Sequence, residues 1–239
     1  MAGTLGFLGD AEAGSGSSVA KDGMTVLSRA ASDENWREVR KLVLDGADLR
    51  VADDQGLTAL HYAAIYGSTA LVRTLLEHGQ AGLVFCEAPG GETSLWLACS
   101  RGHLDVAKML IEAGGKALLL KADKKYGATC LHMPCQNGHI EVVKALIKAG
   151  GEALLLKTAN DGFFCLFIAC QHGRLEIAKA LVKAGGEVLL LKAVNDGRSC
   201  LYVACQEGHL QIAQALIEAG GEALLLKTAN DGASCLYIA

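Results

Sequence analysis

Cysteines and histidines are the side chains of this sequence with the clearest capacity for chemistry. One stretch reads Cys130-x-His132-x-x-Cys135-x-x-x-His139, and all four residues are types that ligate zinc. The same spacing of two cysteines recurs further along the chain, in Cys165/Cys170 and Cys200/Cys205. The pattern raises two hypotheses, a zinc site and a set of redox-sensing thiols.

A structural role explains the same residues without any ligand. Each cysteine and histidine occupies a position that recurs along the chain, and the other units lack the full set of four. The second cysteine of each pair stands where an earlier unit has Ala64, and a free cysteine packs like a small apolar residue. We favour this interpretation and predict neither a metal nor a cofactor.

The sequence also offers no constellation that favours catalysis. A nucleophilic mechanism needs a Cys or Ser, a His base and a carboxylate that converge in one pocket. Candidates recur here as evenly spaced series without a unique trio. The glycine-rich stretch 9–18, GDAEAGSGSS, lacks the GK[ST] of a phosphate-binding loop. We therefore predict no catalytic residue and no enzymatic activity within this chain.

Composition narrows the classes of partner. The 239 residues are 51% hydrophobic and carry a net charge of −4, which provides no electrostatic basis for binding nucleic acid. The longest apolar run, 163–170, is much shorter than the roughly 18 residues of a membrane span. The start of the chain does not resemble a signal peptide, so nine cysteines favour a reducing compartment. We expect the cytoplasm, with the nucleus as the alternative.

An internal repeat supplies the elements that position these residues. The sequence AGGEALLLKTANDG occurs at 149–162 and again at 219–232, and a near-copy occupies 184–197, so the step is 35 residues. Each unit reads as a turn, a short helix, a tight turn and a longer helix that stops at Gly-Gly. Because neither helix can bury its apolar face alone, the units must stack, which predicts a solenoid.

The first helix of each unit carries a family resemblance. Thr58-Ala-Leu-His-Tyr-Ala63 is close to the T-P-L-H-x-A motif of ankyrin repeats. The same register continues in Thr93-Ser-Leu-Trp-Leu-Ala98, Thr129-Cys-Leu-His-Met-Pro134, Phe164-Cys-Leu-Phe-Ile-Ala169, Ser199-Cys-Leu-Tyr-Val-Ala204 and Ser234-Cys-Leu-Tyr-Ile-Ala239. The chain thus resembles the ankyrin repeat family over 22–239, with six full repeats and a truncated seventh. Residues 1–21 are expected to be a disordered Gly/Ser-rich lead.

The resemblance implies an all-α helix-turn-helix solenoid with short hairpin or loop tips. It also bears on the thiols, because equivalent residues of stacked repeats lie about 10 Å apart, whereas a disulfide needs Cα atoms about 4.4–6.8 Å apart. We expect most cysteines to be buried, reduced thiols and Cys86, near a hairpin, to be the most exposed. His132 corresponds to the motif histidine, which makes a local hydrogen bond in the family.

Most units are two or three residues longer than the 33-residue ankyrin unit, and the excess lies around GEALLL. Leu154, Leu155 and Leu156 are too apolar for a solvated loop. We therefore predict an extra helical turn after the Gly-Gly break, with its leucines packed between repeats. Leu83-Val84-Phe85 occupies the same place in the second unit. The alternative is an exposed row of leucines that binds a partner.

Function in such a stack is expected where the repeats differ. The resemblance implies that first helices and hairpin tips form a concave face that binds a partner protein. Variable positions on that face end each first helix or follow each turn glycine. The candidate partner-binding residues are Tyr66, Arg101, Asn137, Phe163, His172, Arg198 and Glu207. Their aromatic and arginine members are the preferred anchors, because such residues dominate interface hot spots; the alternative for each is an ordinary solvated side chain.

Two further features have structural consequences. A lysine follows the leucines in four units, at Lys121, Lys157, Lys192 and Lys227. We favour a solvated charge at these positions over a contact with an acidic partner. Pro134 stands inside the first helix expected for the fourth unit, where the lost hydrogen bond would cost about 3 kcal/mol unless the helix is remodelled.

The predicted function is a protein–protein interaction scaffold that binds an unidentified protein partner. One alternative is the recognition arm of a larger signalling enzyme, such as a kinase or ubiquitin ligase, truncated here. The other is a metal- or redox-sensing protein. The sequence stops within a seventh unit without a polar capping repeat, so self-association through that end is a further expectation.

Overall fold

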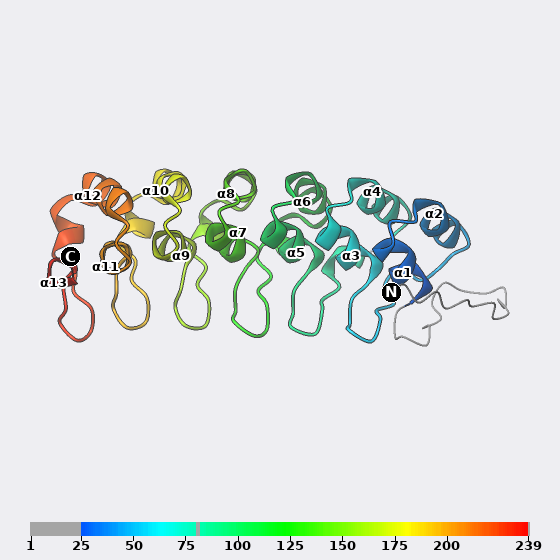
Figure 1. The fold of residues 1–239 in the computed structure, drawn as a ribbon, viewed down its shortest axis with the longest axis horizontal. Coiled ribbons are helices and arrows are strands. Elements are labelled where there is room, and N and C mark those ends of the chain that lie inside the picture. Colours follow the sequence, from blue (N-terminus) through cyan, green and yellow to red (C-terminus); the bar gives the residue numbers. More distant parts are fainter. Residues whose placement is uncertain (1–24, 80–81, 239) are drawn as a thin grey trace, which may run out of the picture.

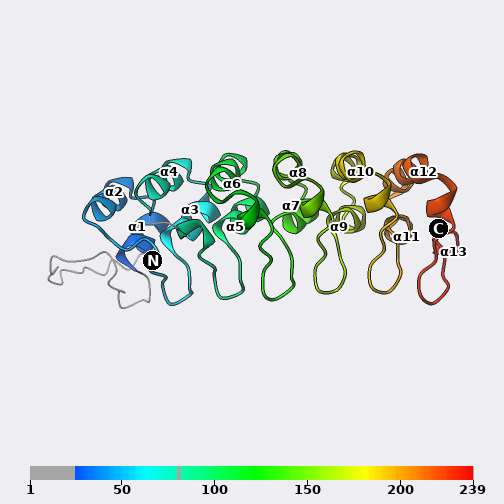
Figure 2. The same ribbon diagram turned by 180° about the vertical axis from the view of Figure 1, so that it is seen from behind.

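The computed structural model describes residues 25–79 and 82–238. Its helices form two rows with hairpins projecting from one side, and α1 and α13 lie at opposite ends (Figures 1 and 2). The row of first helices comprises α1 (Val26–Ser32), α3 (Ala59–Tyr66), α5 (Ser94–Arg101), α7 (His132–Asn137), α9 (Cys165–Gln171), α11 (Cys200–Gln206) and α13 (Cys235–Ile238). The row of second helices comprises α2 (Trp36–Leu44), α4 (Thr69–His78), α6 (Leu104–Leu119), α8 (Ile140–Leu155), α10 (Leu175–Leu190) and α12 (Leu210–Leu225). The predicted all-α solenoid is confirmed.

Stacking of equivalent helices builds one continuous core. Each first helix contacts the first helices before and after it, and neighbouring second helices contact each other in the same way. Four first helices each bury one leucine completely, and the residue just before α7 does the same, namely Leu60, Leu95, Leu166, Leu201 and Leu131. Each repeat therefore covers the apolar face of its neighbour, as the periodic apolar positions require.

Local signals set the ends of the first helices. The Thr58 and His61 side chains form a capping box at the start of α3, and Thr93 Oγ1 accepts a hydrogen bond from Trp96 N at 3.2 Å in α5. Gly102 ends α5 in the left-handed conformation, with φ of 80° and ψ of 15°. These terminators turn the chain directly into the next second helix.

The extra helical turn predicted around GEALLL is confirmed in four repeats. The helices α6, α8, α10 and α12 each continue through the Gly-Gly pair to a length of 16 residues. Gly151 bends α8 with φ of 58° and ψ of −153°, a conformation that essentially only glycine adopts. The first two leucines after the bend are buried in α6, α8 and α10, in Leu118, Leu119, Leu154, Leu155, Leu189 and Leu190. The third leucine is half-buried, or exposed at Leu226.

In the second repeat, a segment with a different backbone conformation fills the equivalent space. A three-residue 3-10 helix, η1 (Leu83–Phe85), replaces the bent end of the long helix, and it buries Leu83 and Val84. The equivalence of this segment with the leucines is thereby confirmed. The same apolar pattern is buried although the backbone differs.

Pro134 is accommodated by a change in where its helix begins. The first helices of the second and third repeats start directly after the motif threonine, at Ala59 and Ser94, whereas α7 starts at His132, two residues later. Pro134 consequently lies in the first turn of α7, where an N–H would have no partner within the helix. Pro134 thus lies inside the first helix as expected, and the later start of α7 is the remodelling that avoids the lost hydrogen bond.

The expected lead, 1–21, lies outside the described residues. At the other end of the stack, Leu226 and Leu236 beside α12 and in α13 are 71% and 73% exposed. Among the helices that the structure describes, none combines the length and the apolar character needed to cross a membrane.

Candidate partner-binding surface

The zinc-type residues of the fourth repeat are engaged in structural contacts. His132 Nδ1 accepts a hydrogen bond from Thr129 N at 3.1 Å, which confirms the local bond predicted for it. His61 Nδ1 makes the same contact with Thr58 N at 3.0 Å. Cys130 and Cys135 are buried beside these elements. Across 25–79 and 82–238, no group of three His, Cys, Asp or Glu side chains is placed to hold a metal ion.

Burial keeps the two motif histidines neutral. It lowers the pKa of His61 and of His132, because the charged imidazolium would lose its hydration. Backbone groups raise these pKa values by less, at Glu92 and Cys86 for His61 and at Phe163 and Thr129 for His132, and Glu92 and Phe163 belong to the following repeat. Each motif histidine therefore belongs to the packing between two repeats.

The thiols are buried, as predicted for most of them. Only Cys86 and Cys205 are half-buried, and the other seven cysteines are buried. Burial raises the pKa of Cys165 to about 12 and that of Cys135 well above its usual value. It also raises the pKa of Cys86. Since the thiolate is the reactive form, these cysteines are poor nucleophiles at neutral pH.

In the third to sixth repeats, the residue after the first-helix glycine bonds back to the preceding repeat. His103 Nε2 donates to the Ile65 carbonyl oxygen at 3.0 Å, and His139 Nε2 donates to that of Ser100 at 3.1 Å. Arg174 and His209 make the equivalent bonds to Gln136 and Gln171, at 2.9 and 3.2 Å. These cross-repeat hydrogen bonds cap the carboxyl end of the first helix behind them. This role accounts for His139, which the sequence had suggested as a zinc ligand.

Five of the seven candidate residues lie at the carboxyl ends of first helices. Tyr66, Arg101 and Asn137 are the last residues of α3, α5 and α7, and His172 and Glu207 cap α9 and α11. All five are exposed. Asn137 Nδ2 also donates to the Ser100 carbonyl oxygen at 2.8 Å, so its amide supports the stack as well.

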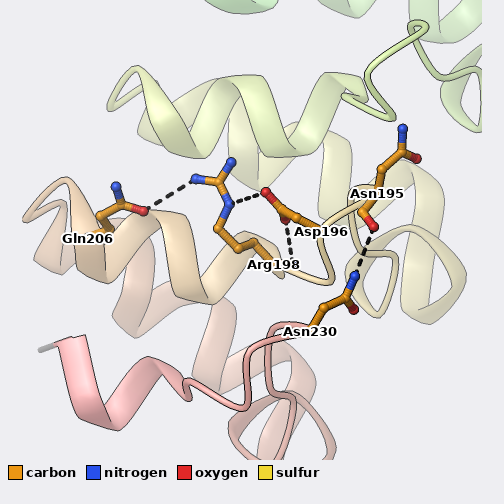
Figure 3. A network of polar contacts seen from close by, with 5 residues as sticks. All are labelled: Asn195, Asp196, Arg198, Gln206 and Asn230. Atoms are coloured by element: carbon orange, nitrogen blue, oxygen red, sulfur yellow. Dashed lines mark hydrogen bonds and ion pairs between the residues drawn. The ribbon is translucent and has the colours of Figure 1, made fainter.

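The other two candidates follow the turn glycine of a hairpin and pack onto the first helix of their own repeat. Phe163 lies with its ring centroid 4.9 Å from that of Phe167. Arg198 Nε donates to Asp196 Oδ2 at 2.8 Å, and its Nη1 donates to Gln206 Oε1 at 3.5 Å (Figure 3). Because Gln206 ends α11, Arg198 connects the hairpin to the helix end. We call the surface formed by these seven residues the variable face.

Two aromatic contacts beside the variable face were not singled out from the sequence. The rings of Tyr62 and Tyr66 stack with centroids 6.4 Å apart, and the Tyr62 hydroxyl donates to Asp53 Oδ2 at 2.8 Å. Tyr126 is 56% exposed, with Lys125 Nζ 4.7 Å from its ring centroid. Tyr126 belongs to the longest hairpin, whose one extra residue was the available signal.

The lysines after the leucines differ from one another. Lys121 and Lys124 both pair with Glu87 of the preceding repeat, and the Lys124–Glu87 distance is 2.9 Å. The two lysines lower the pKa of the Glu87 carboxyl. The expectation of a solvated charge is therefore wrong for Lys121, because the adjacent hairpin brings a carboxylate to it. Lys157 is exposed.

Comparison with known proteins agrees with this architecture. A family model described as ankyrin repeats (3 copies) matches residues 7–85, 82–155, 115–192 and 151–228. The chain belongs to the ankyrin repeat family. Among solved structures, the ankyrin repeat domain of Bcl-3 aligns with a TM-score of 0.78 and 22% identity over 91% of this chain and 94% of that one. The human ASB11 ankyrin repeat domain aligns with a TM-score of 0.71 and 22% identity, over 89% and 90% of the two chains.

Relatives with similar sequences are much longer proteins. Human SMC5-SMC6 complex localization factor protein 1 is 35% identical over 107 residues, which are 43% of this chain and 10% of the relative. Diacylglycerol kinase zeta of Rattus norvegicus is 33% identical over 99 residues, 41% of this chain and 10% of the relative. The match is thus confined to about a tenth of each relative. Ankyrin repeats are generally protein-interaction modules, and this chain has that fold.

Proposed function

We propose that this ankyrin stack is a scaffold that binds a partner protein through its variable face. The observation that carries the proposal is the double contact of Arg198, which joins the hairpin residue Asp196 to Gln206 at the end of a first helix. Two sets of variable positions thereby become one continuous surface. Its aromatic, cationic and amide side chains are types enriched at protein interfaces.

The contacts behind this face support binding rather than catalysis. His61 belongs to the capping box of α3, His139 donates to a backbone carbonyl oxygen, and burial raises the pKa of Cys135 and Cys165. We propose that the chain itself performs no catalytic step. Buried free thiols also favour a reducing compartment, the cytoplasm or the nucleus.

Site-specific photo-crosslinking tests the proposed face. A photoreactive amino acid replaces Tyr66 or Arg101 on the variable face, and Lys148 of α8 serves as the control because it is exposed on the second-helix row. The expected result is crosslinking to the same partner from the first two positions and none from Lys148. Equal crosslinking from all three positions, or from Lys148 alone, would contradict the proposal.

A second candidate follows from the lengths of the relatives. Because the chain matches about a tenth of proteins such as diacylglycerol kinase zeta, we infer that the stack serves as the recognition arm of a longer signalling protein. The intact mass of the protein from its natural source decides this. A mass well above the 24.9 kDa of this sequence supports a recognition arm, and a mass near that value contradicts it.

A further inference from the structure

The second helices of the first two repeats, α2 and α4, lie on the row away from the hairpins (Figure 1). An open groove of about 810 Å³ lies between them. Trp36, Arg40 and Leu44 of α2 line one wall, and Arg73 and Glu77 of α4 line the other. We call this feature the α2–α4 groove. It is separate from the variable face, which lies on the first helices and hairpins.

Three side chains of the α2 wall form a row along the helix, with an apolar side chain at each end. Trp36, Arg40 and Leu44 are spaced by four residues and so share one side of the helix. Trp36 is 37% exposed and Leu44 is 66% exposed, although both are large and apolar. An arginine between two exposed apolar side chains offers a contact of mixed character.

The groove is cationic although the chain as a whole is acidic. Arg37, Arg40 and Arg73 form no ion pair with any residue of the described part of the chain, and Lys41 meets Glu38 only at 3.9 Å. The acidic side chains that line the groove are Asp45 and Glu77. Four cations against two acids leave a local excess of positive charge, whereas the whole sequence carries −4.

A second groove on the same row shows that this chemistry is particular to the start of the stack. The groove between α10 and α12 is smaller, about 350 Å³, and small apolar residues such as Ala178 and Ala215 line much of it. Its Lys179 pairs with Glu176 at 3.6 Å. Unpaired guanidinium groups are therefore a property of the α2–α4 groove and not of second-helix grooves in general.

We propose that the α2–α4 groove docks an acidic, amphipathic helical segment of a partner protein. The apolar side of that segment contacts Trp36 and Leu44, and its carboxylates pair with Arg37, Arg40 and Arg73. Charge complementarity selects the acidic side chains, and the planar guanidinium groups match carboxylates in bidentate geometry. The exposed tryptophan selects an amphipathic segment over a uniformly charged polyanion, since Trp and Arg together are typical interface anchors.

Fluorescence anisotropy with a designed peptide tests the proposal on the full chain. The probe is a labelled helix-forming peptide of about 15 residues with glutamates on one side and leucines on the other. The double variant Arg40→Glu/Arg73→Glu is expected to weaken binding at least about tenfold, and Trp36→Ala several-fold. The matched control Lys179→Glu/Lys183→Glu, in the other groove, is expected to leave affinity unchanged. Circular dichroism confirms that each variant is folded.

Other occupants are distinguished in the same series. Equal affinity for a polyglutamate peptide or for duplex DNA, together with no effect of Trp36→Ala, would show a nonspecific polyanion site and overturn the proposal. A change of sedimentation coefficient on Arg40→Glu/Arg73→Glu without peptide binding would show contact between two copies of this chain, which also overturns it. Equal loss of affinity in the control variant would do the same.

Discussion

The second helices of the first two repeats and those of the next four differ in length and in how their cations are neutralised. α2 and α4 have 9 and 10 residues, whereas α6, α8, α10 and α12 have 16. In α6, α8 and α10 a lysine pairs with an acidic residue three positions earlier. In the described structure, Arg37, Arg40 and Arg73 have no such partner. The three arginines of α2 and α4 thus have no carboxylate partner among the described residues, whereas α6, α8 and α10 each neutralise one lysine within the helix.

The junctions between repeats also differ between the start of the stack and the later repeats, in their hydrogen bonds. From the third repeat onward, a His or Arg donates a cross-repeat hydrogen bond to the preceding first helix. The equivalent residue in the second repeat is Ser68, which instead accepts a hydrogen bond from Leu71 N at 3.4 Å and caps its own helix. The first junction therefore depends more on apolar packing than the later ones.

The largest expected effect concerns the leucines that only the later repeats place on a bent helix. Leu154 is buried, so Leu154→Ala is expected to lower the free energy of unfolding by about 2–5 kcal/mol. Leu226, which is 71% exposed, is the control, and Leu226→Ala is expected to change it by less than about 0.5 kcal/mol. Urea unfolding measures both. Similar losses for the two variants would contradict the assignment of the leucines to the core.

A smaller effect is expected from the glycine that bends each long helix. Gly151→Ala introduces a Cβ into open space, so its cost is conformational, about 1–3 kcal/mol for this region of φ and ψ. Gly138, with φ of 90° and ψ of 20°, is in the left-handed region that asparagine tolerates. Gly138→Asn is therefore expected to cost clearly less in the same urea titration. If Gly151→Ala is neutral, the bend is not what distinguishes the later repeats.

The motif histidines predict a pH dependence that the two regions share. Burial lowers the folded-state pKa of His61 and His132, so below the ordinary pKa near 6.5 the unfolded chain binds more protons than the folded one. The contribution of these histidines to the free energy of unfolding is therefore fully present at pH 7.5. It decreases on acidification, by at most about 1.4 kcal/mol per pH unit for each histidine. Unfolding at pH 7.5 and pH 5.5 measures this loss.

The double variant His61→Gln/His132→Gln is expected to flatten that pH dependence, because glutamine does not titrate. Each single variant should remove part of the slope. Equal contributions would show that the local hydrogen bonds of His61 and His132 work alike in the second and fourth repeats. An unchanged slope in the double variant would assign the acid sensitivity to other groups.

The smallest effect is expected when a later junction between repeats loses its cross-repeat hydrogen bond, which the first junction lacks. His139→Ala removes the bond to the Ser100 carbonyl oxygen and is expected to cost about 0.5–1.5 kcal/mol. Arg174→His exchanges one natural donor at this position for the other, so a change below about 0.5 kcal/mol is expected. Thermal unfolding compares them. No loss in His139→Ala would remove the proposed difference between the junctions.

Much of this protein was determined by its sequence alone. The 35-residue step and the T-P-L-H-x-A register predicted the helices, their stacking and the burial of leucines such as Leu154. The stop expected at Gly-Gly is instead a bend within one long helix, because the second glycine adopts a conformation that keeps the chain helical on both sides. The burial of most cysteines followed from the same register. These features are predictable because a repeated position has the same neighbours in every copy, so one periodic pattern specifies many contacts at once.

Tertiary structure decided the contacts that depend on how adjacent repeats meet. The pairing of Lys121 with Glu87 and the bond from His139 to Ser100 join residues more than 30 positions apart. The late start of α7 depends on how the chain adapts around Pro134. The α2–α4 groove arises from two short helices whose spacing is set by the stack. Sequence periodicity specifies which faces are apolar, but the distance between two particular side chains is fixed only when the repeats pack.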